Sequence, residues 1–149
     1  MIFLTWEFQN FVDDEVVVSK VSKQPSDEND VKYARFWIYS HHIYDKIKRK
    51  IIDDTANALH LNGFFCSGKP GVIIVEGLRK DCDRFWEQIR TLTWKRITLR
   101  HNEEYADSSF LRLGKFREIH FSRVEYLSEL KKELVKADLE YGFTLLLNL

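Results

Sequence analysis

The sequence has little of what builds disulfide frameworks, metal sites and membrane spans. It contains two cysteines, Cys66 and Cys82, whose spacing fits neither a disulfide framework nor a four-ligand metal site. Each is expected to be a small core residue in a reducing compartment. No window approaches the ~20 apolar residues of a membrane helix, and residues 1–7 lack a basic leader. We therefore predict an intracellular protein, nuclear or cytoplasmic, with no membrane partner.

The sequence also lacks an excess of charge of either sign. Its 23 basic and 23 acidic residues balance, so bulk charge favours neither nucleic acid nor membrane as a partner. The balance is uneven along the chain, because residues 1–30 carry seven acids and two bases. The remaining 16 acids and 21 bases give residues 31–149 a net charge of +5. The region that we expect to fold is therefore mildly basic.

Length and composition predict one folded domain preceded by an arm. A chain of 149 residues with 44% hydrophobic content can bury one core and is too short for two full-sized domains. Residues 20–30 are mostly Ser, Lys, Gln, Pro, Asp, Glu and Asn, which bury too little apolar surface to become ordered. We therefore assign residues 1–30 to an N-terminal arm and linker, and residues 31–149 to the folded domain.

An aromatic and β-branched run at residues 36–43 predicts the central strand of a sheet. Successive side chains of a strand point to opposite faces. The two sets are Phe36, Ile38 and Ser40 on one side, and Trp37, Tyr39 and His41 on the other. Both sets are largely apolar, which indicates a sheet that is covered on both faces.

The segments that follow predict a ferredoxin-like fold. A helical pattern with apolar residues at intervals of four begins at Asp45, and a second begins at Asp81; each aspartate is expected to cap its helix. Between them, a glycine-rich turn joins two apolar runs, which predicts a hairpin. The expected elements are a strand at 36–43, a helix at 45–61, strands at 64–66 and 72–75, a helix at 81–93 and a strand at 94–101. This order is the βαββαβ core of ferredoxin-like folds, in the α+β class.

The remaining residues predict a C-terminal helical extension. We expect a loop at 102–114 and a short strand at 116–121. A third helix is indicated by Leu127, Leu130, Leu134 and Ala137, and a short docked helix is expected within residues 139–149.

Four blocks of the sequence resemble a known family. They are Trp37-Ile38-Tyr39-Ser40-His41-His42-Ile43-Tyr44 with Lys48-Arg49-Lys50, Gly68-Lys69-Pro70-Gly71-Val72 with Val75-Glu76-Gly77, Phe85-Trp86, and Trp94-Lys95-Arg96-Ile97. They resemble the C-terminal domain of RWD-domain-containing protein 2 and, more distantly, the C-terminal domain of a tri-snRNP pre-mRNA splicing factor. The resemblance implies a ferredoxin-like domain with a helical extension. It also implies a preceding RWD domain, which residues 1–30 do not resemble. In the splicing relative, the domain contacts structured and single-stranded RNA.

Aromatic and basic residues on neighbouring strands predict a nucleic-acid-binding face. In the usual ferredoxin-like order, the last core strand lies beside the first, so its arginines would share a face with the aromatic rings. Related sheets bind RNA by stacking bases on rings while arginines hold phosphates. The candidate residues are Trp37, Tyr39, His41, Lys69, Lys95, Arg96 and Arg100. The alternative is that the C-terminal helices cover this face and the rings are core. The basic run at residues 46–50 would either extend the patch or form a solvated helix face.

No catalytic set can be assembled from the residues. His41 and His42 are adjacent in a strand and point to opposite faces, so they cannot share one metal ion. Residues 68–71 lack the full phosphate-loop pattern, and Cys66 lacks a histidine partner at a recognisable spacing. We therefore expect no enzyme activity, no cofactor and no small-molecule substrate. Two functions stay open: a binding domain that associates with RNA, or a protein-interaction adaptor with a protein partner and no nucleic-acid ligand.

Overall fold

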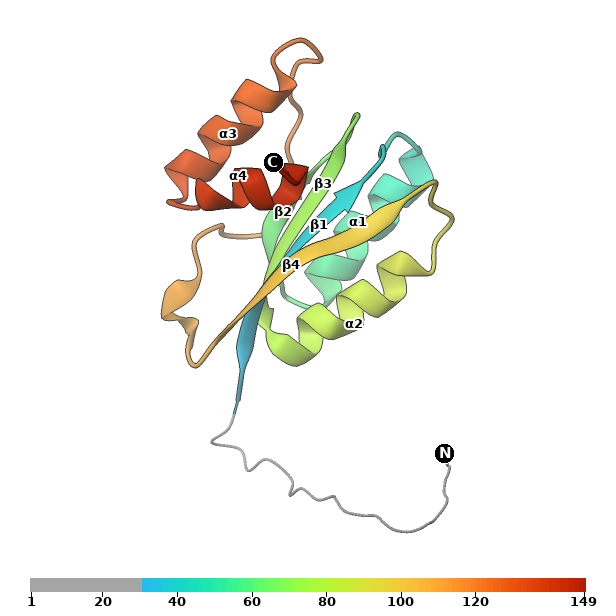
Figure 1. Ribbon diagram of the computed structural model, residues 1–149. Coiled ribbons are helices and arrows are strands. Elements are labelled where there is room, and N and C mark those ends of the chain that lie inside the picture. Colours follow the sequence, from blue (N-terminus) through green and yellow to red (C-terminus); the bar gives the residue numbers. More distant parts are fainter. Residues whose placement is uncertain (1–30) are drawn as a thin grey trace, which may run out of the picture. The chain divides into compact units, whose positions relative to one another are not determined.

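The computed structural model describes residues 31–149, and the predicted arm and linker at residues 1–30 lies outside the described residues (Figure 1). The elements are β1 (Tyr33–Ser40), α1 (Lys46–Ala58), β2 (Asn62–Cys66), β3 (Gly71–Leu78), α2 (Arg79–Arg90), β4 (Ile97–Tyr105), the 3₁₀ helix η3 (Ser108–Phe110), β5 (Arg117–Glu118), α3 (Tyr126–Lys136) and α4 (Tyr141–Leu147). The order from β1 to β4 confirms the predicted ferredoxin-like βαββαβ core. The helices α3 and α4 confirm the C-terminal helical extension.

The strands form one sheet in the order β4-β1-β3-β2-β5. β1 pairs antiparallel with both β3 and β4, which confirms that the first and last core strands are neighbours. β2 and β3 form the predicted hairpin, and the short β5 adds to β2 in parallel. β1 is therefore flanked on both edges, and its exit at Ser40 lies between the ends of β3 and β4.

Helices cover both faces of the sheet (Figure 1). Beneath α1 and α2 lies a core that includes Phe36 and Ile38, whereas Trp37 belongs to the core beneath α3 and α4. The alternation predicted for β1 is therefore confirmed. The second core is closed by leucines of the extension, namely Leu130, Leu134, Leu139 and Leu146. Within residues 31–149, no helix combines the length and the apolar character needed to span a bilayer.

The two helix starts differ in how well their sequence signals predict them. The Asp45 carboxylate accepts a hydrogen bond from the Ile47 amide at 3.3 Å, as expected of an N-cap. α2 instead begins at Arg79, and its N-cap is Leu78, which makes no side-chain capping bond. Asp81 therefore lies inside the first turn, where its charge is favourable to the helix dipole. The second helix was predicted correctly and its cap was not.

β4 begins later and ends later than the predicted strand at 94–101. It runs to Tyr105, which pairs with Tyr33 at the far end of β1. The polar residues from Asn102 to Glu104 therefore belong to a strand and not to the predicted loop. Asn102 and Glu104 are exposed on this edge strand, whereas Glu103 forms an ion pair with Arg35 on β1 at 2.9 Å. The register shifts between Trp37, which pairs with His101, and Ile38, which pairs with Leu99. Arg100 is therefore an extra residue in β4.

α4 approaches the sheet closely because residue 142 is a glycine. A Cβ atom at Gly142 would lie 2.1 Å from two ring atoms of Trp37, far inside van der Waals contact. The Trp37 ring also packs edge-on against Tyr141, with ring centroids 5.7 Å apart. The extension therefore seals the sheet over Trp37.

Candidate nucleic-acid interface

Four of the predicted binding residues gather where β1 leaves the sheet. The backbone amide of His41 donates to the carbonyl of Arg96 at 3.0 Å. Desolvation, followed by the positive charges of Lys95 and Lys69, lowers the pKa of His41. Arg96 also contributes to this shift. His41, Lys69, Lys95 and Arg96 therefore form one electrostatic cluster, although three separate segments of the chain supply them.

Tyr39 and Arg100 extend this cluster along the two neighbouring strands. The guanidinium carbon of Arg100 lies 4.2 Å from the centroid of the Tyr39 ring, a cation–π contact. Both side chains are half-buried. The Nε of Arg100 is buried and has no hydrogen-bond partner within residues 31–149. We call Tyr39, His41, Lys69, Lys95, Arg96 and Arg100 the strand-end surface.

Trp37 is not part of this surface. Its side chain is completely buried beneath α4, so it cannot stack on a base, and its prediction as a binding residue is corrected to a core residue. Trp37 is buried because the leucines of the extension pack against this face of the sheet and form one apolar core with it. At Trp37, the predicted alternative is therefore correct: the C-terminal helices cover this face and the ring belongs to the core.

The cations of the strand-end surface differ from the basic run of α1. In the described part of the chain, the exposed side chains of Lys69, Lys95 and Arg96 form no ion pair or hydrogen bond. On α1, by contrast, Arg49 pairs with Glu118 at 3.1 Å and Lys50 pairs with Asp54 at 3.0 Å. Lys48 of the same run lies over the Trp94 ring, so most of the α1 run already has partners. The strand-end cations are therefore free to contact a ligand.

A groove adjoins the strand-end surface and shares Lys69 with it. Its volume is about 680 Å³. The lining residues are Tyr44, Ser67, Gly68, Lys69, Phe121, Arg123 and Tyr126, and we call it the Tyr126 groove. Sequence reasoning missed Arg123 and Tyr126, because neither carries a motif and both reach the hairpin turn only through the docking of α3.

A buried polar cluster at the opposite end of β1 was also missed. Arg35 is 2% exposed, and it donates to Glu76 and to Glu103, both at 2.9 Å. It donates to the carbonyl of Phe110 at 2.7 Å as well. The second oxygen of Glu76 accepts from the backbone amides of residues 112 and 113, each at 2.8 Å. Every charge here is satisfied within the fold, so the cluster attaches the segment around η3 to the sheet and leaves no group for a ligand.

The cysteines are placed as the sequence predicts. Cys66 and Cys82 are both free and buried. Burial raises the pKa of Cys82 to about 12 and that of Cys66 well above its usual value, so both are protonated thiols near neutral pH. Within residues 31–149, no three His, Cys, Asp or Glu side chains come together as metal ligands would.

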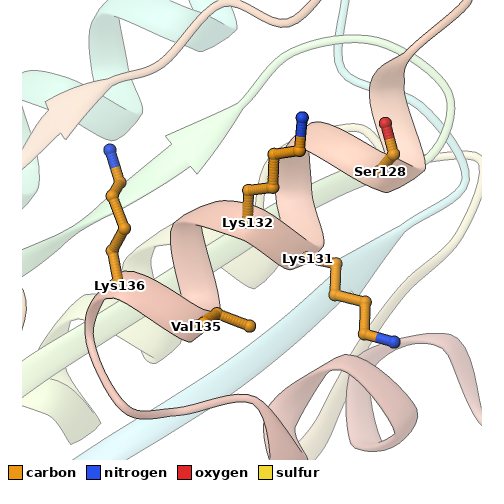
Figure 2. A pocket seen from close by; sticks show the side chains of 5 residues that line it. All are labelled: Ser128, Lys131, Lys132, Val135 and Lys136. Carbon is orange, nitrogen blue, oxygen red and sulfur yellow. The ribbon is translucent and has the colours of Figure 1, made fainter.

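The outer face of α3 presents a second exposed surface (Figure 2). A cavity of about 560 Å³ is lined by Ser128, Lys131, Lys132, Val135 and Lys136. Lys132 and Lys136 extend from the same side of α3, whereas Lys131 extends from the opposite side (Figure 2). There Lys131 approaches Glu140 at 3.8 Å. Two apolar residues of α3, Leu127 and Val135, are 49% and 50% exposed. We call Ser128, Lys132, Val135 and Lys136 the α3 face.

Comparison with known proteins places the chain in a family. The profile of the small nuclear ribonucleoprotein Prp3 C-terminal domain matches residues 36–146. The chain belongs to this family. The match includes every strand and helix from β1 to α4, apart from the first three residues of β1 and the last residue of α4. It confirms the more distant of the two predicted resemblances; that to RWD-domain-containing protein 2 stays a prediction.

A curated relative and two solved structures are also similar. The chain is 31% identical over 80 residues to phomoidride biosynthesis cluster protein F of a fungal species, strain ATCC 74256. That alignment covers 49% of this chain and only 27% of the relative. The BLUF protein BlrB in its dark state has a TM-score of 0.54 at 16% identity, covering 80% of this chain and 99% of BlrB. A bacterial light-regulated adenylyl cyclase has a TM-score of 0.52 at 12% identity, covering 71% of this chain and 34% of the cyclase. At such low identity, these structures indicate a shared fold alone.

Proposed function

We propose that residues 31–149 form a non-enzymatic binding domain that associates with RNA through the strand-end surface. The observation that carries this proposal is the cluster of cations without partners around His41. The positive charges of Lys69, Lys95 and Arg96 all act on His41, and such a local excess of unpaired positive charge is suited to phosphates. The half-buried Tyr39 ring, braced by Arg100, adds an aromatic surface beside them.

Because α4 covers Trp37, the expected binding mode differs from that of an open sheet. The rings of the sheet centre are not available for stacking, so phosphate contacts at the strand end should supply most of the affinity. Such contacts position an RNA strand and carry little sequence information. We therefore expect weak dependence on sequence and strong dependence on salt.

Membership of the Prp3 C-terminal domain family supports a role in a ribonucleoprotein. The family is named for a small nuclear ribonucleoprotein, and on that basis we propose a nuclear location. Kinship with RWD-domain-containing protein 2 is part of the same proposal. This kinship implies the same ferredoxin-like domain with a helical extension, and it does not suggest any particular ligand.

A titration with a matched control tests the RNA proposal. A labelled single strand and a short stem are titrated at two salt concentrations with the wild type and with Arg96→Gln/Arg100→Gln. Each lost phosphate contact should reduce the log–log salt slope by about 0.7 for a single strand. The double variant should therefore bind every sequence more weakly, with a slope flatter by about 1.4 if each arginine makes one contact.

The control variant is Lys132→Gln/Lys136→Gln, which removes the same charge from the α3 face. It should bind RNA as the wild type does. Equal weakening by both double variants would show attraction to net charge only. No binding by the wild type at low salt would refute the RNA proposal.

The adaptor function remains the second candidate, and the α3 face favours it. Its half-exposed apolar residue Val135 lies beside Lys132 and Lys136. An amphipathic helix with acidic residues flanking an apolar stripe would complement this pattern. If this face is used, Val135→Asp should abolish binding of such a peptide and leave RNA binding unchanged.

A further inference from the structure

The Tyr126 groove has walls that the backbone holds in place. Ile43 and Gly68 exchange two backbone hydrogen bonds, at 2.9 and 2.8 Å, which fix the segment before α1 against the hairpin turn. Gly68 has a φ of +120°, which side chains rarely allow. A Cβ atom there would lie 3.1 Å from the Tyr126 ring. The turn and α3 thus meet closely at the base of the groove.

A residue that lines the groove carries a buried hydroxyl that lacks a partner. Tyr126 is 7% exposed, and its buried oxygen makes no hydrogen bond within residues 31–149. Burial raises the pKa of Tyr126, with smaller contributions from Cys66 and Tyr44. The hydroxyl therefore keeps its proton and can act as a donor. Buried tyrosine hydroxyls usually find an acceptor, so a ligand that brings one into the groove would complete this site.

The other walls supply positive charge and aromatic surface. Lys69 and Arg123 are exposed, and within the described residues neither forms an ion pair. Tyr44 is 58% exposed, and Phe121 packs edge-on against Tyr126, with ring centroids 5.5 Å apart. Cations beside aromatic rings and a polar donor suit a ligand that has an anion, a flat ring and acceptor atoms.

We propose that the Tyr126 groove takes one unstacked nucleotide of the RNA strand held by the strand-end surface. Its phosphate would lie between Lys69 and Arg123, and its base would lie against Phe121 and Tyr44. An acceptor on the base edge would receive the Tyr126 hydroxyl hydrogen bond after the Tyr126 side chain turns its buried oxygen toward the groove. A volume of about 680 Å³ is within the range of small-ligand sites. This inference rests on the proposed function, since Lys69 is shared between the groove and the strand-end surface.

The test combines Tyr126→Phe with RNA strands that lack one base. Tyr126→Phe removes only the unpaired hydroxyl, so thermal stability should stay the same or rise. Binding of the intact strand should weaken by roughly fivefold, the effect of one hydrogen bond. An abasic nucleotide at the groove position should weaken wild-type binding, and Tyr126→Phe should then cause no further loss. The matched control is Tyr141→Phe at the other end of the sheet, which should leave RNA affinity unchanged.

The outcomes separate this inference from the proposed function. If Tyr126→Phe binds intact RNA as tightly as the wild type while Arg96→Gln/Arg100→Gln weakens binding, the groove inference is overturned and the RNA proposal stands. If the wild type binds no RNA, the groove is tested with adenosine and uridine monophosphate by NMR. Signals that shift at Tyr126 and Arg123 would support a nucleotide ligand without a strand. An absence of shifts would overturn the inference as well.

Discussion

The two ends of β1 use their neighbouring cations in opposite ways. At the start of the strand, Arg35 is buried, and all three of its guanidinium nitrogens donate hydrogen bonds. At the exit, Lys95 and Arg96 are exposed and form no ion pair within residues 31–149. A buried charge needs an opposite charge and hydrogen bonds from within the protein, whereas an exposed charge is solvated by water and remains available to a ligand. The start of β1 is therefore built for stability, and its exit is suited to binding.

The largest expected effect concerns the seal over the sheet. Leu130 is completely buried in the core beneath α3 and α4. Leu130→Asp would place a charge there, with an expected loss of about 5 kcal/mol in the free energy of unfolding. Urea denaturation measures this loss. A wild-type melting temperature for the variant would mean that α3 is not docked, and neither the buried core around Trp37 nor the Tyr126 groove at the exit end would then be formed as described.

The next effect concerns the buried cluster at the start of β1. Arg35→Met keeps the apolar stem but leaves Glu76 and Glu103 without their cation. We expect a loss of about 3 kcal/mol, because removing one partner exposes the cost of the other buried charge. Urea denaturation again measures it, together with RNA affinity of the folded fraction. Weaker RNA binding at unchanged stability would reverse the roles assigned to the two ends.

A smaller effect is expected where α4 meets the sheet. Gly142→Ala forces a methyl group into the Trp37 ring, so the helix or the ring must shift. The expected loss is about 1 to 3 kcal/mol, typical of overpacked cores. Gly114→Ala is a useful comparison, because a Cβ there meets no atom within 4 Å but its φ of +72° is unfavourable. If both variants lose the same free energy of unfolding, the close approach of α4 to Trp37 is not the reason that residue 142 must be a glycine.

How much the sequence predicts depends on the range of the interaction. The alternation from Phe36 to Tyr39 is local, and it predicted both faces of β1 correctly. The partnership of Arg35 with Glu76 spans 41 residues and requires the register of β1 on β3. No local pattern contains that register, so both residues escaped prediction.

The candidate site shows the same limit. Lys69, Lys95, Arg96 and His41 were predicted as binding residues, and the structure brings them together because their strands are neighbours. Trp37 was named as a binding residue, with a core position beneath the C-terminal helices as the alternative, and the alternative is correct. The sequence could not separate the two, since an aromatic residue in a strand looks the same whether or not a later helix covers it. Tyr126 reaches the groove only because α3 packs on the sheet. The leucine spacing predicts this helix but does not say where it packs.

The most direct test of the central claim is an NMR titration of residues 31–149 in the full chain with a short single-stranded RNA. The account predicts that backbone and side-chain signals shift at His41, Lys69, Lys95, Arg96 and Arg100, and that signals of Lys132 and Lys136 on α3 do not. Arg35 should keep its signals, because its bonds within the fold persist. Shifts confined to the α3 face, or an absence of shifts at the strand-end surface, would contradict the account.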